Sequence, residues 1–380
     1  MIGYVWFGAH HIFYGCESDF QMIPEEQQLY PLEMSLHRIR TVWGGWTGKI
    51  GEIWTIAGPP HESLVLNGAL AGRSLTEVVG GYQQKLLGLD MELDPREPFP
   101  LLLKFLSTAK AHPIEVHPND PYTVAKGLPM VGRDKIWYIL AARPGSRIYL
   151  GFKDRVTPEK ILEGINGKYL HHLMNRITVR SGDVFTIPAG RIHGIGKGVT
   201  FFEIQNHSSL GFELLDPNKK PSEKPMEMAD LEETLEVLDL DAIDPEAVTP
   251  LSVPFDNGNI DYLALTPRHF LRKLKIKESF EIPFSGNRFV LYTGLRGTGW
   301  LRWGLSKIYA KIHPYQSVLV PAAEEDLLFE TEGGLEVLET SVPHMGGGIQ
   351  KEIEGTRVSK DLFTSLGGKD YRMILRSLLG

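Results

Sequence analysis

Gly182-Asp-Val-Phe-Thr-Ile-Pro-Ala-Gly-Arg-Ile-His193 is the stretch of this sequence that decides the fold prediction. A Gly-Asp turn at its start leads into a strand, and Pro188 and Gly190 shape a second tight turn. The next strand would carry His193 into the interior of a β-barrel. A single histidine is usually a satisfied core or surface residue, but this spacing favours a metal ligand.

The remainder of the chain has the composition of an all-β core. Runs rich in Val, Ile, Phe and Tyr alternate with turn residues over 146–207 and again over 287–341, which predicts many short strands. The two blocks share a pattern without sequence identity, so we expect two copies of one β architecture. The second block has a proline but no histidine at the corresponding place in 317–326, and we expect it to be metal-free.

Helix signals lie before, within, between and after these blocks. Ser74 and Glu77 form a capping box, and Thr157 is an N-cap followed by a proline at the first helical position. The predicted helices are 74–89, 157–175, a short segment within 222–250, and a C-terminal one around 370–379.

A chain of 380 residues is long enough for two or three domains. We expect four parts: an N-terminal extension at 1–28, a catalytic metal-binding domain with helical insertions at 29–250, a second β domain at 251–345, and a tail at 346–380.

Two further candidate metal ligands lie in the segment Ile114-Glu-Val-His117. Because alternate residues of a strand share one face, Glu115 and His117 would point into the same cavity. A carboxylate, two imidazoles and an open position form a common catalytic Zn²⁺ shell, which also suits Fe²⁺ or Mn²⁺. The alternative is an exposed strand with an incidental Glu-x-His pair.

Composition excludes several function classes. A net charge of −7 and a pI near 6.0 argue against general nucleic-acid binding, since phosphate backbones require clustered Lys and Arg. A single cysteine, Cys16, predicts a reducing compartment. The apolar N-terminus lacks the basic residues and cleavage pattern of a signal peptide. We therefore expect a cytoplasmic protein without a membrane span, acting on a small molecule.

Further segments resemble those of one family. They are VWGGWTGKIGEIWTIAGPPHESLVLNGALAGRSL (42–75), FPLLLKFLSTAKAHPIEVHPND (99–120), GRDKIWYILAARPGSRIYLGF (132–152) and SGDVFTIPAGRIHGIGKGVTFFEIQNHSS (181–209). Together they are similar to the motifs of bacterial type I mannose-6-phosphate isomerases, which belong to the cupin superfamily. The resemblance extends in detail over about 32–216.

This resemblance implies two cupin (jelly-roll) domains and a zinc-dependent interconversion of mannose 6-phosphate and fructose 6-phosphate. His117 and His193 correspond to the two histidine ligands of the family. Lys104 corresponds to a lysine of the sugar-phosphate pocket, and Arg133 replaces another pocket lysine with its charge retained.

The sequence departs from the family pattern at the carboxylate ligand. The family's glutamate corresponds to Lys135, and a cation cannot ligate a metal ion. The position two before the first histidine, which is Gln or Lys in relatives, is Glu115 here. We hypothesise that the carboxylate has moved to the neighbouring strand, which leaves Glu115, His117 and His193 as ligands. Alternatively, Glu115 and Lys135 form an ion pair across an empty site.

Two further departures fall in the inferred pocket. A serine that holds phosphate in some relatives corresponds to Pro113, which has neither hydroxyl nor N–H. The arginine expected after the EIQ strand corresponds to Glu213, which would be either a general base or a salt-bridged residue. Arg191, close to His193, could restore a positive charge. With Lys135, Arg191 and Glu213 are the catalytic candidates.

These departures leave three functions open. The first is a metal-dependent isomerase acting on mannose 6-phosphate. The second is a catalytically degenerate cupin that binds a sugar or sugar phosphate without turnover. The third is an isomerase with a shifted substrate, in which a less anionic sugar tolerates Glu213.

Overall fold

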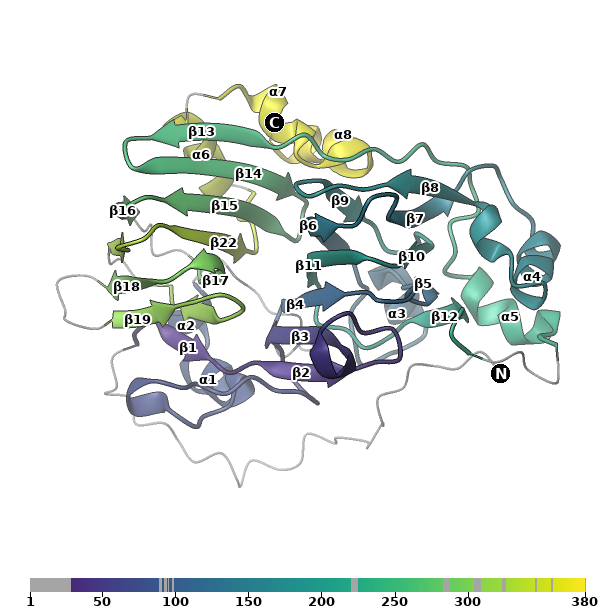
Figure 1. Cartoon of the computed structure of the whole chain (residues 1–380), viewed down its shortest axis with the longest axis horizontal. Coiled ribbons are helices and arrows are strands. Elements are labelled where there is room, and N and C mark those ends of the chain that lie inside the picture. The colour runs from purple at the N-terminus through teal and green to yellow at the C-terminus, as the bar shows by residue number, and fades with distance from the viewer. Residues whose placement is uncertain are drawn as a thin grey trace. The chain divides into compact units, whose positions relative to one another are not determined.

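The computed structural model describes residues 29–88, 91, 94, 96–97, 99–219, 225–282, 288–303, 309–322, 326–345, 347–356 and 358–379 (Figure 1). The predicted N-terminal extension, including Cys16, lies outside these residues. Strands dominate the described part of the chain, which confirms the prediction of a mainly β protein.

The described residues form two compact units. The first comprises 38–53 and 104–247, and the second comprises 29–37, 54–103 and 248–379. The boundaries that we expect at 250 and 345 stay a prediction.

Two antiparallel sheets make up most of the first unit. One has five strands in the order β12 (Phe212–Leu215), β5 (Ile114–Val116), β10 (His193–Ile195), β7 (Arg147–Phe152) and β8 (Met174–Thr178). The other has six strands in the order β2 (His37–Arg40), β3 (Ile50–Ile56), β4 (Leu102–Ser107), β11 (Val199–Gln205), β6 (Lys135–Ala142) and β9 (Val184–Ile187).

A shared hydrophobic cluster holds the two sheets together. Ile148 of β7 and Ile195 of β10 come from the five-stranded sheet, and Leu106, Trp137 and Phe201 come from the six-stranded sheet. These side chains define the interior face of each sheet. Because side chains alternate along a strand, a residue two positions before or after any of these five also faces this interior.

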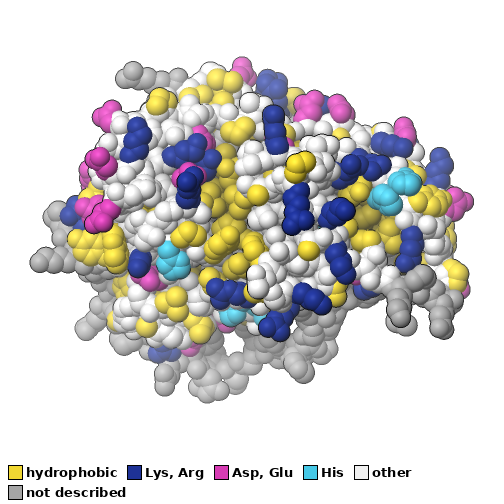
Figure 2. Space-filling model, in the orientation of Figure 1, with side chains coloured by type: hydrophobic (Ala, Val, Ile, Leu, Met, Phe, Trp, Pro, Cys, Tyr) yellow, Lys and Arg dark blue, Asp and Glu magenta, His cyan; other side chains and the backbone are white. Residues whose placement is uncertain are grey.

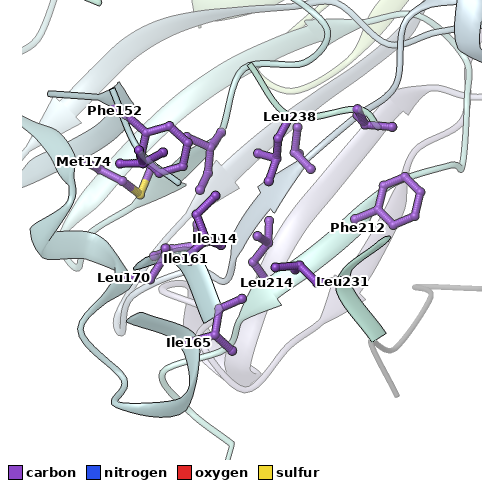
Figure 3. Packing of buried hydrophobic residues seen from close by; sticks show 14 residues of the cluster. Ile114, Phe152, Ile161, Ile165, Leu170, Met174, Phe212, Leu214, Leu231 and Leu238 are labelled. Atoms are coloured by element: carbon purple, nitrogen blue, oxygen red, sulfur yellow. The ribbon is translucent and has the colours of Figure 1, made fainter. Parts of the chain in front are cut away.

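Helices cover the opposite face of the five-stranded sheet. Figure 3 shows Ile161 and Ile165 of α4 (Pro158–Asn166) and Leu231 of α5 (Met228–Leu235) packed with Ile114 and Leu214. Since Ile114 faces these helices, the next residue, Glu115, faces the interior between the sheets. The helices thereby fix which side chains of β5 and β12 face inward.

The second unit also contains two antiparallel sheets. The larger has the order β1 (Leu32–Met34), β20 (Ser317–Val320), β17 (Val290–Gly297), β22 (Leu335–Ser341), β15 (Phe270–Ile276), β14 (Gly258–Leu265) and β13 (Leu251–Phe255). The smaller has the order β16 (Ser279–Ile282), β21 (Leu327–Glu330), β18 (Gly299–Trp303) and β19 (Tyr309–Ile312). A buried cluster draws residues from both sheets, so the two blocks predicted from the sequence are both sheet pairs.

Helix prediction succeeds best where a cap is present. The helix α1 (Leu75–Tyr82) has the predicted Ser74–Glu77 capping box, but the predicted helix 74–89 is interrupted at Gln83, whose φ is positive. Thr157 caps α4, but this helix ends at Asn166 and not at 175, because the chain turns at Gly167 and enters β8. The remaining helical segments are α2 (Gln84–Leu87), α3 (Asp120–Ala125), α6 (Gly348–Thr356), α7 (Lys360–Ser365), α8 (Gly368–Leu379), η1 (Thr47–Lys49), η2 (Gly68–Leu70) and η3 (Leu170–His172).

Two observations bear on a membrane or polyanion partner. Within the described residues, no helix is both long and apolar enough to cross a membrane. On the face drawn in Figure 2, Lys and Arg side chains are interspersed with acidic and hydrophobic ones.

Candidate metal centre

Glu115, His117 and His193 converge between the two sheets of the first unit. Their candidate ligand atoms all lie within 4.8 Å of one another. His193 of β10 pairs directly with Glu115 of β5, and His117 follows β5 by one residue. The predicted shared face of Glu115 and His117 is therefore present, and the second strand brings His193 to it.

Backbone carbonyls orient both imidazoles. His117 Nδ1 lies 3.2 Å from the carbonyl oxygen of Leu210, and His193 Nδ1 lies 2.8 Å from that of Arg191. Since a carbonyl oxygen only accepts hydrogen bonds, each Nδ1 carries the proton and each Nε2 keeps its lone pair. The Nε2 atom of His193 is buried and has no hydrogen-bond partner among the described residues. This arrangement is typical of ligating histidines.

The protonation states also suit ligands. Burial, assisted by the positive charge of Lys135, lowers the pKa of His193 to about 3. Burial and the neighbouring Arg133 lower the pKa of His117 as well. For Glu115, burial raises the pKa, but His112, His117 and Lys135 outweigh it and hold the pKa well below its usual value. At neutral pH the cluster thus contains two neutral imidazoles and one carboxylate, the forms that bind a metal ion.

A buried carboxylate, Glu203 of β11, organises the cations beside this cluster. Its Oε1 lies 3.1 Å from Lys104 Nζ, and its Oε2 lies 3.5 Å from Lys135 Nζ. Trp137 Nε1 donates a 2.5 Å hydrogen bond to the same Oε2. Lys104 also contacts Glu52 at 3.2 Å. The sequence-predicted Lys104 and Lys135 are therefore held in one ion-pair network.

The two lysines differ in proton affinity although they share Glu203. Burial lowers the pKa of each, but Lys104 has two carboxylates, Glu203 and Glu52, and its pKa is raised on balance. For Lys135, burial outweighs the attraction of Glu203, which lies farther away at 3.5 Å, and of Glu115, so its pKa is lowered. Burial raises the pKa of Glu203, yet the two lysines bring it down to about 2. Lys135 is consequently the buried amine that gives up its proton more readily.

Lys135 does not pair with Glu115. Among the described residues its ion pair is with Glu203, whereas Glu115 lies 3.9 Å from His112 and 3.5 Å from His117. The alternative of a Glu115–Lys135 ion pair across an empty site is thus not the geometry observed.

Arg133 reaches the cluster from the loop before β6. Its Nη1 lies 3.4 Å from His117 Nε2. Burial lowers the pKa of Arg133 to about 10, against the opposing effect of Glu115, so the guanidinium stays charged at neutral pH. A fixed, buried cation beside the ligand nitrogen suits recognition of an anionic group.

The other two catalytic candidates have partners away from the ligand atoms. Arg191 Nη2 lies 3.6 Å from Asp239 Oδ2, and the backbone carbonyl oxygen of Arg191 accepts from His193 Nδ1. Glu213 lies opposite Glu115 in the sheet and forms an ion pair with Lys219 at 2.6 Å. Burial raises the pKa of Glu213, against the effect of Lys219.

Sequence reasoning missed Glu203, Trp137, Glu52 and Lys219. A weak signal existed for Glu203, which interrupts the apolar run FFEIQ in a fully buried strand. An acidic residue in such a run requires a buried partner. Lys219 carries no comparable signal, because a lysine in a polar turn is usually solvated.

Comparison with known proteins identifies the family. A model described as phosphomannose isomerase type I, catalytic domain, matches residues 47–130. Mannose-6-phosphate isomerase ManA of Bacillus subtilis is 30% identical over 219 residues, which cover 55% of this chain and 67% of that protein. This chain belongs to the mannose-6-phosphate isomerase family. A family member from Streptococcus mutans is 26% identical over 289 residues, or 73% of this chain and 88% of that protein.

Solved structures of mannose-6-phosphate isomerases have the same fold. The crystal structure of the Bacillus subtilis enzyme superposes with a TM-score of 0.71 at 21% identity, covering 82% of this chain and 99% of that chain. A zinc-bound mannose 6-phosphate isomerase superposes with a TM-score of 0.63 at 12% identity, covering 83% and 100%. The cupin fold predicted from the sequence is therefore confirmed.

Proposed function

We propose that this protein is a metal-dependent aldose–ketose isomerase that interconverts mannose 6-phosphate and fructose 6-phosphate in the cytoplasm. The observation that carries the proposal is the convergence of Glu115, His117 and His193 within 4.8 Å, in a chain of the mannose-6-phosphate isomerase family. We propose Zn²⁺ as the ion, with Fe²⁺ or Mn²⁺ as alternatives that the same donor set accepts.

The donor chemistry fits a divalent ion. Two imidazoles present Nε2 lone pairs, one of which is buried without a partner among the described residues, and a carboxylate lies 3.5 Å from His117 Nε2. A bound ion would polarise the sugar's carbonyl and hydroxyl oxygens. Glu115, His117 and His193 would hold it.

The charge balance of the site supports a phosphorylated substrate. The charged side chains next to the cluster are Lys104, Arg133 and Lys135, against Glu52, Glu115 and Glu203. With Lys135 protonated these charges cancel, and with Lys135 as a neutral amine they sum to one negative charge. A divalent ion would leave two positive charges in the first case and one in the second, which the phosphate group of a sugar phosphate would offset.

The chain's own residues supply the remaining roles. Lys135 is the proposed proton carrier, since burial lowers the pKa of its amine and a neutral amine can remove a proton from a sugar carbon. Glu203, held by Trp137, would orient Lys135 and stabilise its ammonium form after proton transfer. Lys104 and Arg133 are the proposed sugar-phosphate contacts, and Arg191 would orient His193 through its backbone.

A second candidate function is sugar-phosphate binding without turnover. The observation that favours it is Lys135, an ammonium-bearing residue buried within Coulombic reach of His193. If Lys135 remained protonated throughout, it would weaken metal binding and leave no base for isomerisation.

The test is a coupled assay for fructose 6-phosphate formation from mannose 6-phosphate, with metal content measured on the same sample. Removal of the ion by chelator and restoration with Zn²⁺, Fe²⁺ or Mn²⁺ should abolish and restore turnover. Glu115→Gln and His193→Gln should each reduce kcat/KM by more than about 100-fold. His269→Gln, a buried histidine of the second unit, is the matched control and should retain turnover.

Each remaining outcome is decisive. Metal-loaded protein that binds mannose 6-phosphate without turning it over would replace the isomerase with the binding protein. Turnover of a different sugar would assign the shifted substrate. Failure to bind any of the three ions would overturn the metal centre.

A further inference from the structure

Glu213 faces the same interior as the candidate metal ligands. β12 runs antiparallel to β5, and Glu213 is directly opposite Glu115 in the register. Paired residues on neighbouring antiparallel strands project to the same side of the sheet. The Glu213 side chain is 12% exposed and that of Glu115 is 18% exposed, so both carboxylates are mostly buried.

Lys219 neutralises this carboxylate from the solvent side. Its Nζ lies 2.6 Å from Glu213 Oε1, and its side chain is 65% exposed. The other lysines of the site, Lys104 and Lys135, are 12% and 5% exposed and lie against Glu203. Lys219 is thus far more accessible to an arriving anion than either of them.

The turn that carries Lys219 is fixed in place. Its backbone N–H donates to the carbonyl oxygen of Asp216 at 3.2 Å, and its own carbonyl accepts from Lys168 Nζ at 3.1 Å. Asn218 donates from Nδ2 to the carbonyl oxygen of Ala111 at 2.8 Å, which attaches the turn to the segment that leads into β5. The position of the ammonium is therefore set by both its backbone and Glu213.

We propose that Lys219, positioned by Glu213, is a substrate-binding residue that attracts and contacts the phosphate group at the solvent edge of the site. This inference rests on the proposed function, because it takes the substrate to be a sugar phosphate. An unpaired Glu213 would repel a phosphate dianion, and the ion pair removes that repulsion. The ammonium of Lys219 has three N–H donors, so it can bind a phosphate oxygen while it keeps its bond to Glu213.

The test compares exposed lysines in similar ion pairs. Lys219→Gln should raise the KM for mannose 6-phosphate about 10-fold and change kcat less than about twofold, since one charge-assisted contact is lost. Lys219→Arg should restore most of the affinity. Lys126→Gln breaks the 2.8 Å Lys126–Glu236 pair of the same unit and should leave KM unchanged.

A second readout does not depend on turnover. Inorganic phosphate should inhibit competitively, or bind to the metal-loaded protein in calorimetry, about 10-fold more weakly in Lys219→Gln than in the wild type. If the wild-type protein has no isomerase activity, the proposed function fails, and the calorimetric comparison still tests Lys219. Equal KM and equal phosphate affinity in Lys219→Gln and wild type would overturn the inference.

Discussion

His193 in the first unit and His269 in the second are alike in isolation. Each imidazole is buried, at 3% and 0% exposure. Each has an Nε2 atom without a hydrogen-bond partner among the described residues. Burial lowers the pKa of each to about 3. By the criteria of burial and perturbed pKa, both would be candidate functional residues.

Their neighbours differ. His193 shares its surroundings with Glu115 and His117. The His269 imidazole instead has Thr266 beside it in the turn between β14 and β15, with Nδ1 3.4 Å from the Thr266 hydroxyl oxygen. In the described part of the chain, the cluster around His193 is the group of three His, Cys, Asp or Glu residues close enough to hold an ion. Convergence of lone pairs, and not burial, distinguishes the candidate metal centre.

The buried charges of the two units differ in the same way. In the second unit Arg272 and Glu339 are paired across β15 and β22, with Arg272 Nε donating to Glu339 Oε1 at 2.9 Å. In the first unit one carboxylate, Glu203, is shared between Lys104 and Lys135. The Arg272–Glu339 pair joins one cation to one carboxylate, whereas Glu203, together with Glu52, binds two lysines beside the candidate metal ligands.

The largest expected effect concerns the Arg272–Glu339 pair. Glu339→Leu leaves Arg272 buried without its carboxylate and should lower the free energy of unfolding by about 3–5 kcal/mol. Urea denaturation measures the loss. Because the pair lies outside the metal centre, isomerase turnover of the folded variant should stay close to that of the wild type.

The double variant Arg272→Met/Glu339→Leu is the control for this prediction. It should recover most of the lost stability, since it removes both charges. If Glu339→Leu loses less than about 1 kcal/mol, or the double variant is no more stable than the single one, the pair does not have the structural role assigned to it.

An intermediate effect separates the two histidines directly. Zn²⁺ at about 100 times its dissociation constant should stabilise the wild-type protein by about 2.7 kcal/mol. Zn²⁺ should raise the thermal midpoint of unfolding of His269→Gln as it does that of the wild type, and it should not raise that of His193→Gln. Equal shifts in the two variants would show that the ion binds elsewhere.

The smallest effect is a pH dependence that comes from His269. Its pKa is about 3 in the folded chain, against about 6.5 when unfolded. Between these values the unfolded chain binds the proton and the folded chain does not, so stability falls as the pH drops below about 6.5. From pH 7 to pH 5 the expected contribution is about 2 kcal/mol.

Urea denaturation of metal-loaded wild type and His269→Gln at both pH values isolates this contribution. The wild type should lose about 2 kcal/mol more than the variant between pH 7 and pH 5. Equal losses would mean that His269 is protonated in the folded protein at pH 5.

Local sequence patterns predicted much of the fold and part of the candidate metal centre. The Ser74–Glu77 capping box fixed the start of α1, and strand alternation correctly put Glu115 and His117 on one face. The same kind of local pattern wrongly predicted that α4 continues to 175. The apolar spacing does continue beyond Gly167, but the chain there forms η3 and β8. Local patterns hold best where backbone hydrogen bonds close within a few residues.

The sequence by itself determined the chemical character of this protein: a β-rich chain in which one carboxylate and two histidines have the spacing of metal ligands. Only the tertiary structure decided the partners of the charged residues. Lys135 pairs with Glu203, and Glu213 pairs with Lys219. The physical reason is that strand alternation specifies a face within a few residues, whereas an ion pair depends on which strands become neighbours and in which register.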